Sequence, residues 1–75
     1  MDIRKRLGRN VRHLRTREGW SQEDYAERAG IHRTYVSDIE RGERNPTITV
    51  VEKLAVALGV TASELLAAAT PEAKR

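Results

Sequence analysis

The sequence predicts an all-α domain of five short helices. Apolar residues recur at spacings of three and four, as they do along one side of a helix, and no stretch alternates convincingly as a strand would. Glycine, the residue that most often ends a helix, follows four of these stretches. The chain has 75 residues, enough for one domain, and no cysteine, so the core must form without disulfides.

The first two expected helices have clear ends. The apolar stripe of the first, which stops before Gly19, consists of Ile3, Leu7, Val11 and Leu14. The second begins at a capping box, in which Ser21 accepts from the Asp24 amide and the Asp24 carboxylate reaches back. Trp20 and Tyr25 have the spacing of a hydrophobic staple across that start. Gly30 ends this helix.

The third helix is expected from about His32 to Arg41. Val36 and Ile39 form its inner side, and Gly42 is a plausible left-handed stop. At 100° per residue, His32 falls on the same inner side.

The last two helices follow a loop at Asn45 and Pro46. Thr47 is expected to cap a helix whose apolar stripe consists of Ile48, Val51, Leu54, Ala55 and Leu58. Thr61 and Glu64 form a capping box for a final short helix that ends near residue 69. We therefore expect one domain over residues 1–69 and a flexible tail over 70–75.

Basic residues crowd the start of a chain whose net charge is only +3. Asp2 and Glu18 alone oppose a group that consists of Arg4, Lys5, Arg6, Arg9, Arg12, Arg15 and Arg17. Such clusters favour polyanionic partners, although a solvated helix face carries the same pattern. No apolar run approaches the roughly 18 residues of a membrane span, so we expect a soluble, cytoplasmic protein with no membrane partner.

Two helices that meet at a short turn around Gly30 have the helix-turn-helix arrangement, here over about residues 21–41. The outer side of the second helix bears short polar groups and guanidinium groups: Arg33, Thr34, Ser37 and Arg41. A recognition helix enters the major groove of DNA by its N-terminal residues. Arg can donate two bonds to guanine, and Thr and Ser can bond other base edges. The pattern therefore predicts that Arg33, Thr34 and Ser37 read bases.

The stretches that carry this pattern resemble the lambda repressor/Cro-type (XRE-like) family over about residues 3–67. They are residues 21–26 (SQEDYA), 30–42 (GIHRTYVSDIERG), 46–47 (PT) and 54–61 (LAVALGVT). Residues 32–35 and 40–45 are similar to restriction–modification controller proteins in particular. Trp20 and Tyr25 stand where that family usually has aliphatic residues, which we interpret as packing substitutions.

The resemblance implies a compact lambda repressor-like fold and a sequence-specific regulator of transcription that binds double-stranded operator DNA as a homodimer on two half-sites. Gln22 would bond a phosphate and a base edge, beside the three base-reading residues. The sugar-phosphate backbone would be held by Tyr35, Arg41, Arg44 and Asn45, with Tyr35 equally interpretable as a rim residue over the core. By analogy, the dimer interface would include Val60, Leu65, Leu66 and Ala67, unless these close the core.

One carboxylate needs a cation. Glu40 lies in the last turn of its helix, where the helix dipole disfavours negative charge. In the family, the residues that match Arg15 and Glu40 form an ion pair, which links the first and third helices. The resemblance therefore implies that Arg15 is the cation for Glu40. The alternative is that Arg41 or Arg44 screens Glu40 and leaves Arg15 free.

Other classes of function find little support. The histidines, His13 and His32, are too few for a metal site, and Ser21, His32 and Asp38 match a catalytic triad only by residue type. We expect no cofactor and no enzymatic activity. Two alternatives remain: an antitoxin or other protein-interaction module on the same fold, and nonspecific binding to the nucleoid. Whether regulation is repression or activation stays open.

Overall fold

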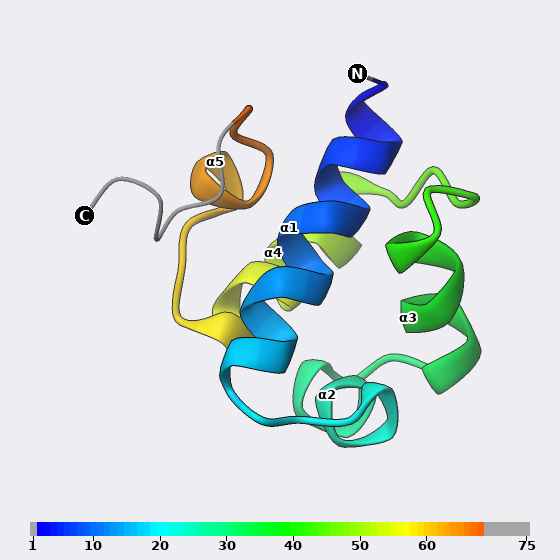
Figure 1. Cartoon of the computed structure of the whole chain (residues 1–75), viewed down its shortest axis with the longest axis vertical. Coiled ribbons are helices and arrows are strands. Elements are labelled where there is room, and N and C mark those ends of the chain that lie inside the picture. The colour runs from blue at the N-terminus through cyan, green and yellow to red at the C-terminus, as the bar shows by residue number, and fades with distance from the viewer. Residues whose placement is uncertain (1, 69–75) are drawn as a thin grey trace.

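The structure, a computed structural model, describes residues 2–68 and confirms the all-α fold. It contains five helices and no strand in that range: α1 (Ile3–Arg17), α2 (Gln22–Ala29), α3 (Arg33–Glu40), α4 (Ile48–Leu58) and α5 (Ala62–Leu65). The helix α1 runs through the centre with α3 and α5 on opposite sides, and α4 crosses behind it (Figure 1). The expected tail at 70–75 lies outside the described residues.

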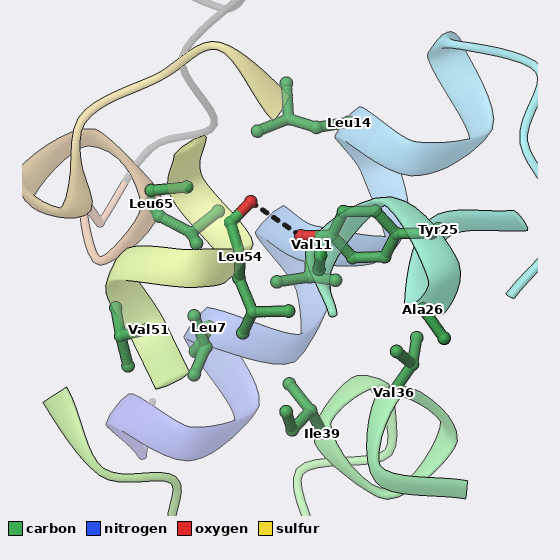
Figure 2. Close-up of a cluster of buried hydrophobic side chains, with 12 residues drawn as sticks. Leu7, Val11, Leu14, Tyr25, Ala26, Val36, Ile39, Val51, Leu54 and Leu65 are labelled. Carbon is green, nitrogen blue, oxygen red and sulfur yellow. Dashed lines mark hydrogen bonds between the residues drawn. The ribbon is translucent and has the colours of Figure 1, made fainter. Parts of the chain in front are cut away.

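All five helices contribute to one core. Its apolar members are Leu7, Val11, Leu14, Tyr25, Ala26, Ala29, Val36, Ile39, Val51, Leu54, Ala55 and Leu65. The Tyr25 hydroxyl donates to the Leu54 carbonyl at 2.8 Å, the bond dashed in Figure 2. The buried ring thus joins α2 to α4 with its polar atom satisfied.

The predicted helix starts are confirmed. Both capping boxes form, with Ser21 accepting from Asp24 at the start of α2 and Thr61 from Glu64 at the start of α5. The Trp20 ring stacks on the Tyr25 ring at 6.1 Å between centroids. The two capping boxes satisfy backbone amides that a helix start leaves without partners. The local sequence therefore sets where α2 and α5 begin.

Gly8 allows the backbones of α1 and α3 to approach closely. A Cβ atom added there would lie 2.3 Å from the Ile39 carbonyl oxygen and 2.8 Å from that of Glu40. Any side chain would push the two helices apart. The helical pattern gave no signal for this requirement, because it scores glycine in mid-helix only as a poor helix former.

Asn10 ties α1 to the end of α5. It is fully buried, and its Nδ2 donates to the carbonyls of Leu65 at 2.8 Å and Ala67 at 2.9 Å. In a longer helix the Leu65 carbonyl would accept from the amide four residues on. The helix α5 ends at Leu65, earlier than the predicted end near residue 69, and Asn10 binds two carbonyls at and just beyond this end.

Three predicted inward side chains are exposed. Ile3, the first residue of α1, is 51% exposed. Ile48 is 87% exposed, because it is the first residue of α4 and nothing in the described range covers that turn. His32 is also exposed, because it is the N-cap of α3 and has extended backbone angles that the helical rotation does not describe. Its Nδ1 accepts from the Thr34 amide at 3.2 Å.

Candidate nucleic-acid interface

The helices α2 and α3 form a helix-turn-helix. Gly30 adopts left-handed angles (φ 71°, ψ 34°) that end α2, and the Ile31 amide bonds back to the Ala26 carbonyl at 3.0 Å. Val36 and Ile39 then anchor α3 in the core. The arrangement fixes α3 with its opposite side outward.

The structure places the three predicted base-reading side chains on that outward side. Arg33 and Thr34 are exposed in the first turn of α3, and Ser37 is half-buried one turn later. The first-turn residues are those that a recognition helix inserts first. Gln22, predicted to share this role, opens α2 and is half-buried.

Asp38 binds the two cations that follow the predicted base-reading residues. Its two carboxylate oxygens accept from Arg41 Nη2 at 2.6 Å and from Arg44 Nη2 at 3.1 Å. Arg41 also donates to the Ser37 hydroxyl and, through Nε, to Glu43 at 3.1 Å, which raises the pKa of its guanidinium. The sequence pattern did not single out Asp38, because its spacing to Arg44 crosses the end of the helix.

Tyr35 lies at the rim of the core, half-buried. The Arg44 guanidinium lies 4.5 Å from the centroid of its ring, within the range of a cation–π contact. The ring therefore packs inward on one side and holds a predicted backbone-binding arginine on the other. Asn45, the next residue, is exposed in the loop before α4.

An ion pair joins α1 to the end of α3. Arg15 Nε lies 2.6 Å from Glu40 Oε2, and its Nη2 donates to Oε1 at 3.0 Å. The two side chains are only 11% and 4% exposed. Gln22 Nε2 donates to the same Oε1 at 3.0 Å, which brings the start of α2 to this point. Both alternative cations for Glu40 are bound elsewhere: Arg41 to Asp38 and Glu43, and Arg44 to Asp38.

The residues predicted for a dimer interface divide into two kinds. Val60, Leu66 and Ala67 are half-buried and retain surface for a partner. Leu65 is fully buried in the core and offers none, so its assignment to an interface is wrong. It is the fourth residue of α5, the position that a hydrophobic staple turns inward toward Val60.

Neither a cluster of metal ligands nor a membrane-spanning helix occurs within residues 2–68. No three histidine or acidic side chains there converge as metal ligands would. No helix in that range is long and apolar enough to cross a membrane.

Comparison with known proteins places this geometry in a family. A hypothetical transcription factor of Neisseria meningitidis is 48% identical over 65 residues, which are 87% of this chain and 61% of that protein. The chain thus spans less than two thirds of that relative. The crystal structure of the restriction–modification controller protein C.AhdI from Aeromonas hydrophila matches with a TM-score of 0.81 and 40% identity, over 87% of this chain and 98% of the other.

A third similar structure is that of SinR, a master regulator for biofilm formation, solved in complex with DNA. It matches with a TM-score of 0.77 and 35% identity, over 81% of this chain and 98% of the other. The family model described as Helix-turn-helix (HTH_3) matches residues 11–65, most of the described fold. The predicted resemblance is confirmed, and the chain belongs to the HTH_3 helix-turn-helix family.

Proposed function

We propose that this protein is a sequence-specific transcriptional regulator that binds double-stranded DNA as a homodimer on two half-sites. The observation that carries the proposal is the outer side of α3, which presents Arg33, Thr34 and Ser37 while the inner side is locked in the core. A similar regulator is known in complex with DNA, and another is a restriction–modification controller. No observation favours the protein-interaction alternative. We place the protein where its DNA is, in the cytoplasm.

Each residue on the reading side has a role that its chemistry suits. Arg33, exposed in the first turn, can bond guanine O6 and N7 together. Thr34 and Ser37 are short enough to let α3 approach the base edges closely. Gln22 opens α2 and has an amide that can reach a phosphate or a base edge after its bond to Glu40 is exchanged.

The backbone-binding group lies at the other end of α3. The side chains of Arg41 and Arg44 are each about half-exposed, and that of their partner Asp38 is 21% exposed. Tyr35 and Asn45 flank them. Contacts of these groups to phosphates would set the position of α3 on the duplex without selecting a sequence.

A single reading helix contacts too few base pairs for useful selectivity. Two copies that bind half-sites about 34–36 Å apart double the contact. We assign the interface to the half-buried Val60, Leu66 and Ala67. Val56 on α4 is 67% exposed and adds apolar surface that a second copy can cover.

Selection of bound duplexes from random DNA tests the proposal. The expected result is a site of two inverted half-sites, with sedimentation showing two protomers on each duplex. The matched control is a chain with Arg33, Thr34 and Ser37 all replaced by Ala, which should keep nonspecific binding and select no site. Absence of enrichment by the wild-type chain would refute sequence-specific binding. Monomers alone, with and without the selected DNA, would refute the dimer.

A further inference from the structure

A basic cleft lies between α1 and the C-terminal end of α3, apart from the reading side. It has a volume of about 420 Å³ and is lined by Lys5, Arg9, Arg12, His13, Thr16, Glu40 and Arg41. Five of these residues come from one side of α1, at helical spacing over twelve residues. The three cations among them, Lys5, Arg9 and Arg12, form a strip about 10 Å long at 1.5 Å per residue.

Positive charge in the cleft is not balanced by the protein. Four of the lining side chains are Lys or Arg, against one carboxylate. That carboxylate, Glu40, is already bound by Arg15 and Gln22. In the part of the chain that the structure describes, Lys5 and Arg12 have no side-chain hydrogen bond or ion pair, and Arg9 donates only to an amide oxygen and a backbone carbonyl.

Cations at these spacings repel one another in the free protein. Lys5 and Arg9 are four residues apart and Arg9 and Arg12 three, the separations at which like charges destabilise a helix. A chain of anions laid along α1 would remove this repulsion. One DNA strand offers a phosphate for every 3.4 Å of helix axis, so a strip of this length can meet several in succession.

Arg41 connects the cleft to the reading side of α3. It lines the cleft, and its guanidinium also donates to the hydroxyl of Ser37, one of the base-reading residues. A DNA strand that passes the end of α3 would therefore meet the mouth of the cleft. This continuity favours the flanking strand of the same duplex over a separate small anion.

We propose that Lys5, Arg9 and Arg12 on α1 form a second phosphate-binding strip, which holds the DNA backbone that flanks the half-site read by α3. The inference rests on the proposed function. The strip adds affinity that does not depend on base sequence, and it lengthens the protected DNA beyond the base pairs that α3 contacts.

The test is the double variant Lys5→Gln/Arg12→Gln, which removes two charges from side chains that hold no other group. Gln is as good a helix former as the residues replaced, so the fold should persist, as circular dichroism can verify. The matched control is Lys53→Glu, which changes the net charge by the same amount at an exposed position on α4, away from the cleft and the reading side.

Binding is measured against salt concentration on the selected duplex with long flanks and on a random duplex of equal length. The double variant should lower the slope of log K against log salt by about two per bound protomer on both duplexes. At 0.1 M salt this corresponds to affinity losses on the order of tens of fold. The ratio of selected to random affinity should not change.

Each contrary result has a separate meaning. An unchanged slope, or the same change in Lys53→Glu, would overturn the strip while leaving the regulator intact. An RNA duplex of equal length is titrated in parallel, and a slope that the double variant lowers on the RNA but on neither DNA would assign the strip to RNA and overturn the DNA proposal. Equal affinity of the wild-type chain for the selected and the random duplex would refute the proposed function. The salt slope of the double variant on the random duplex would still test the strip.

Discussion

Arg15 and Glu40 form a bidentate ion pair that joins α1 to the end of α3. Arg15 donates a hydrogen bond to each carboxylate oxygen of Glu40, through Nε and Nη2. Its third nitrogen, Nη1, donates to the Trp20 carbonyl at 2.7 Å. The guanidinium therefore fixes the end of α3 and the chain before α2 at once. Because Gln22 also bonds Glu40, the starting residue of α2 is held to the same carboxylate. The relative position of α2 and α3 depends on this one group.

Replacing Arg15 by Met should destabilise the fold by about 3–5 kcal/mol, because a nearly buried carboxylate loses its cation. Urea unfolding measures the loss. The informative control is Arg15→Met/Glu40→Met, in which no charge remains buried. This double variant should recover much of the loss, since replacing both partners of a buried pair is far less costly than removing one.

If Arg15→Met/Glu40→Met is as unstable as Arg15→Met, the loss of stability comes from the other hydrogen bonds of the pair. These are the bonds from Arg15 to the Trp20 carbonyl and from Gln22 to Glu40. A charge-reversed pair is not an equivalent test. A carboxylate at position 15 has no N–H to donate to the Trp20 carbonyl, so even a well-formed reversed pair would recover only part of the stability.

The starts of α2 and α5 were predictable because their signals are local. Ser21 and Asp24 are three residues apart, and the bonds that they form involve only their own helix start. The Arg15–Glu40 pair required the family resemblance as well, since the two residues are 25 positions apart. The position of Glu40 in the last turn of α3, where the helix dipole disfavours negative charge, indicated that it needs a cation but not which one.

The features that were missed depend on contacts between distant segments. Gly8 matters because α3 passes over it, and Asn10 because the end of α5 does. Neither residue has a local pattern that indicates a partner. Ile48 shows the converse error: an apolar residue in register with a buried stripe is covered only if another element reaches that turn.

Tyr25→Phe should cost about 1 kcal/mol of unfolding free energy and leave DNA binding unchanged. The substitution removes the bond from the buried hydroxyl to the Leu54 carbonyl but keeps the ring that stacks on Trp20. It leaves no buried donor without a partner. Urea unfolding beside a titration with the selected duplex checks both parts. A loss of unfolding free energy well above about 2 kcal/mol would indicate that this hydrogen bond also holds α4 in position against α2.

The first turn of α1 should loosen in acid at an unusually low pH. Hydrogen bonds from Arg4, by its side chain and its amide, lower the pKa of Asp2 from 3.8 to about 2. A depressed carboxyl pKa means that the cap's contribution is complete above about pH 4 and lost as pH falls through about 2. NMR titration of the Arg4 amide measures this midpoint. Asp2→Asn should abolish the step, and a midpoint near 3.8 would contradict the capping geometry.

Asp38→Asn should tighten binding to random DNA and reduce the preference for the selected site. The carboxylate repels nearby phosphates, and it also holds Arg41 and Arg44 in place. Removing its charge frees both arginines to meet any phosphate. Stability should change by less than about 1 kcal/mol, because the pairs are exposed. Weaker binding to both DNAs would show instead that Asp38 positions the arginines for every duplex.

Arg33→Ala and Arg44→Ala should weaken DNA binding in different ways. Arg33 is placed to contact a base edge, so its loss should cost about 1–3 kcal/mol on the selected site and relax the preference at one position in each half-site. Arg44 is placed to contact the backbone, so its loss should weaken all sequences alike and lower the salt slope by about one unit per protomer. Titrations over a panel of single-base variants at several salt concentrations separate the two effects. Equal losses on every sequence from both substitutions would show that Arg33 binds a phosphate, and that Thr34 and Ser37 read the bases without it.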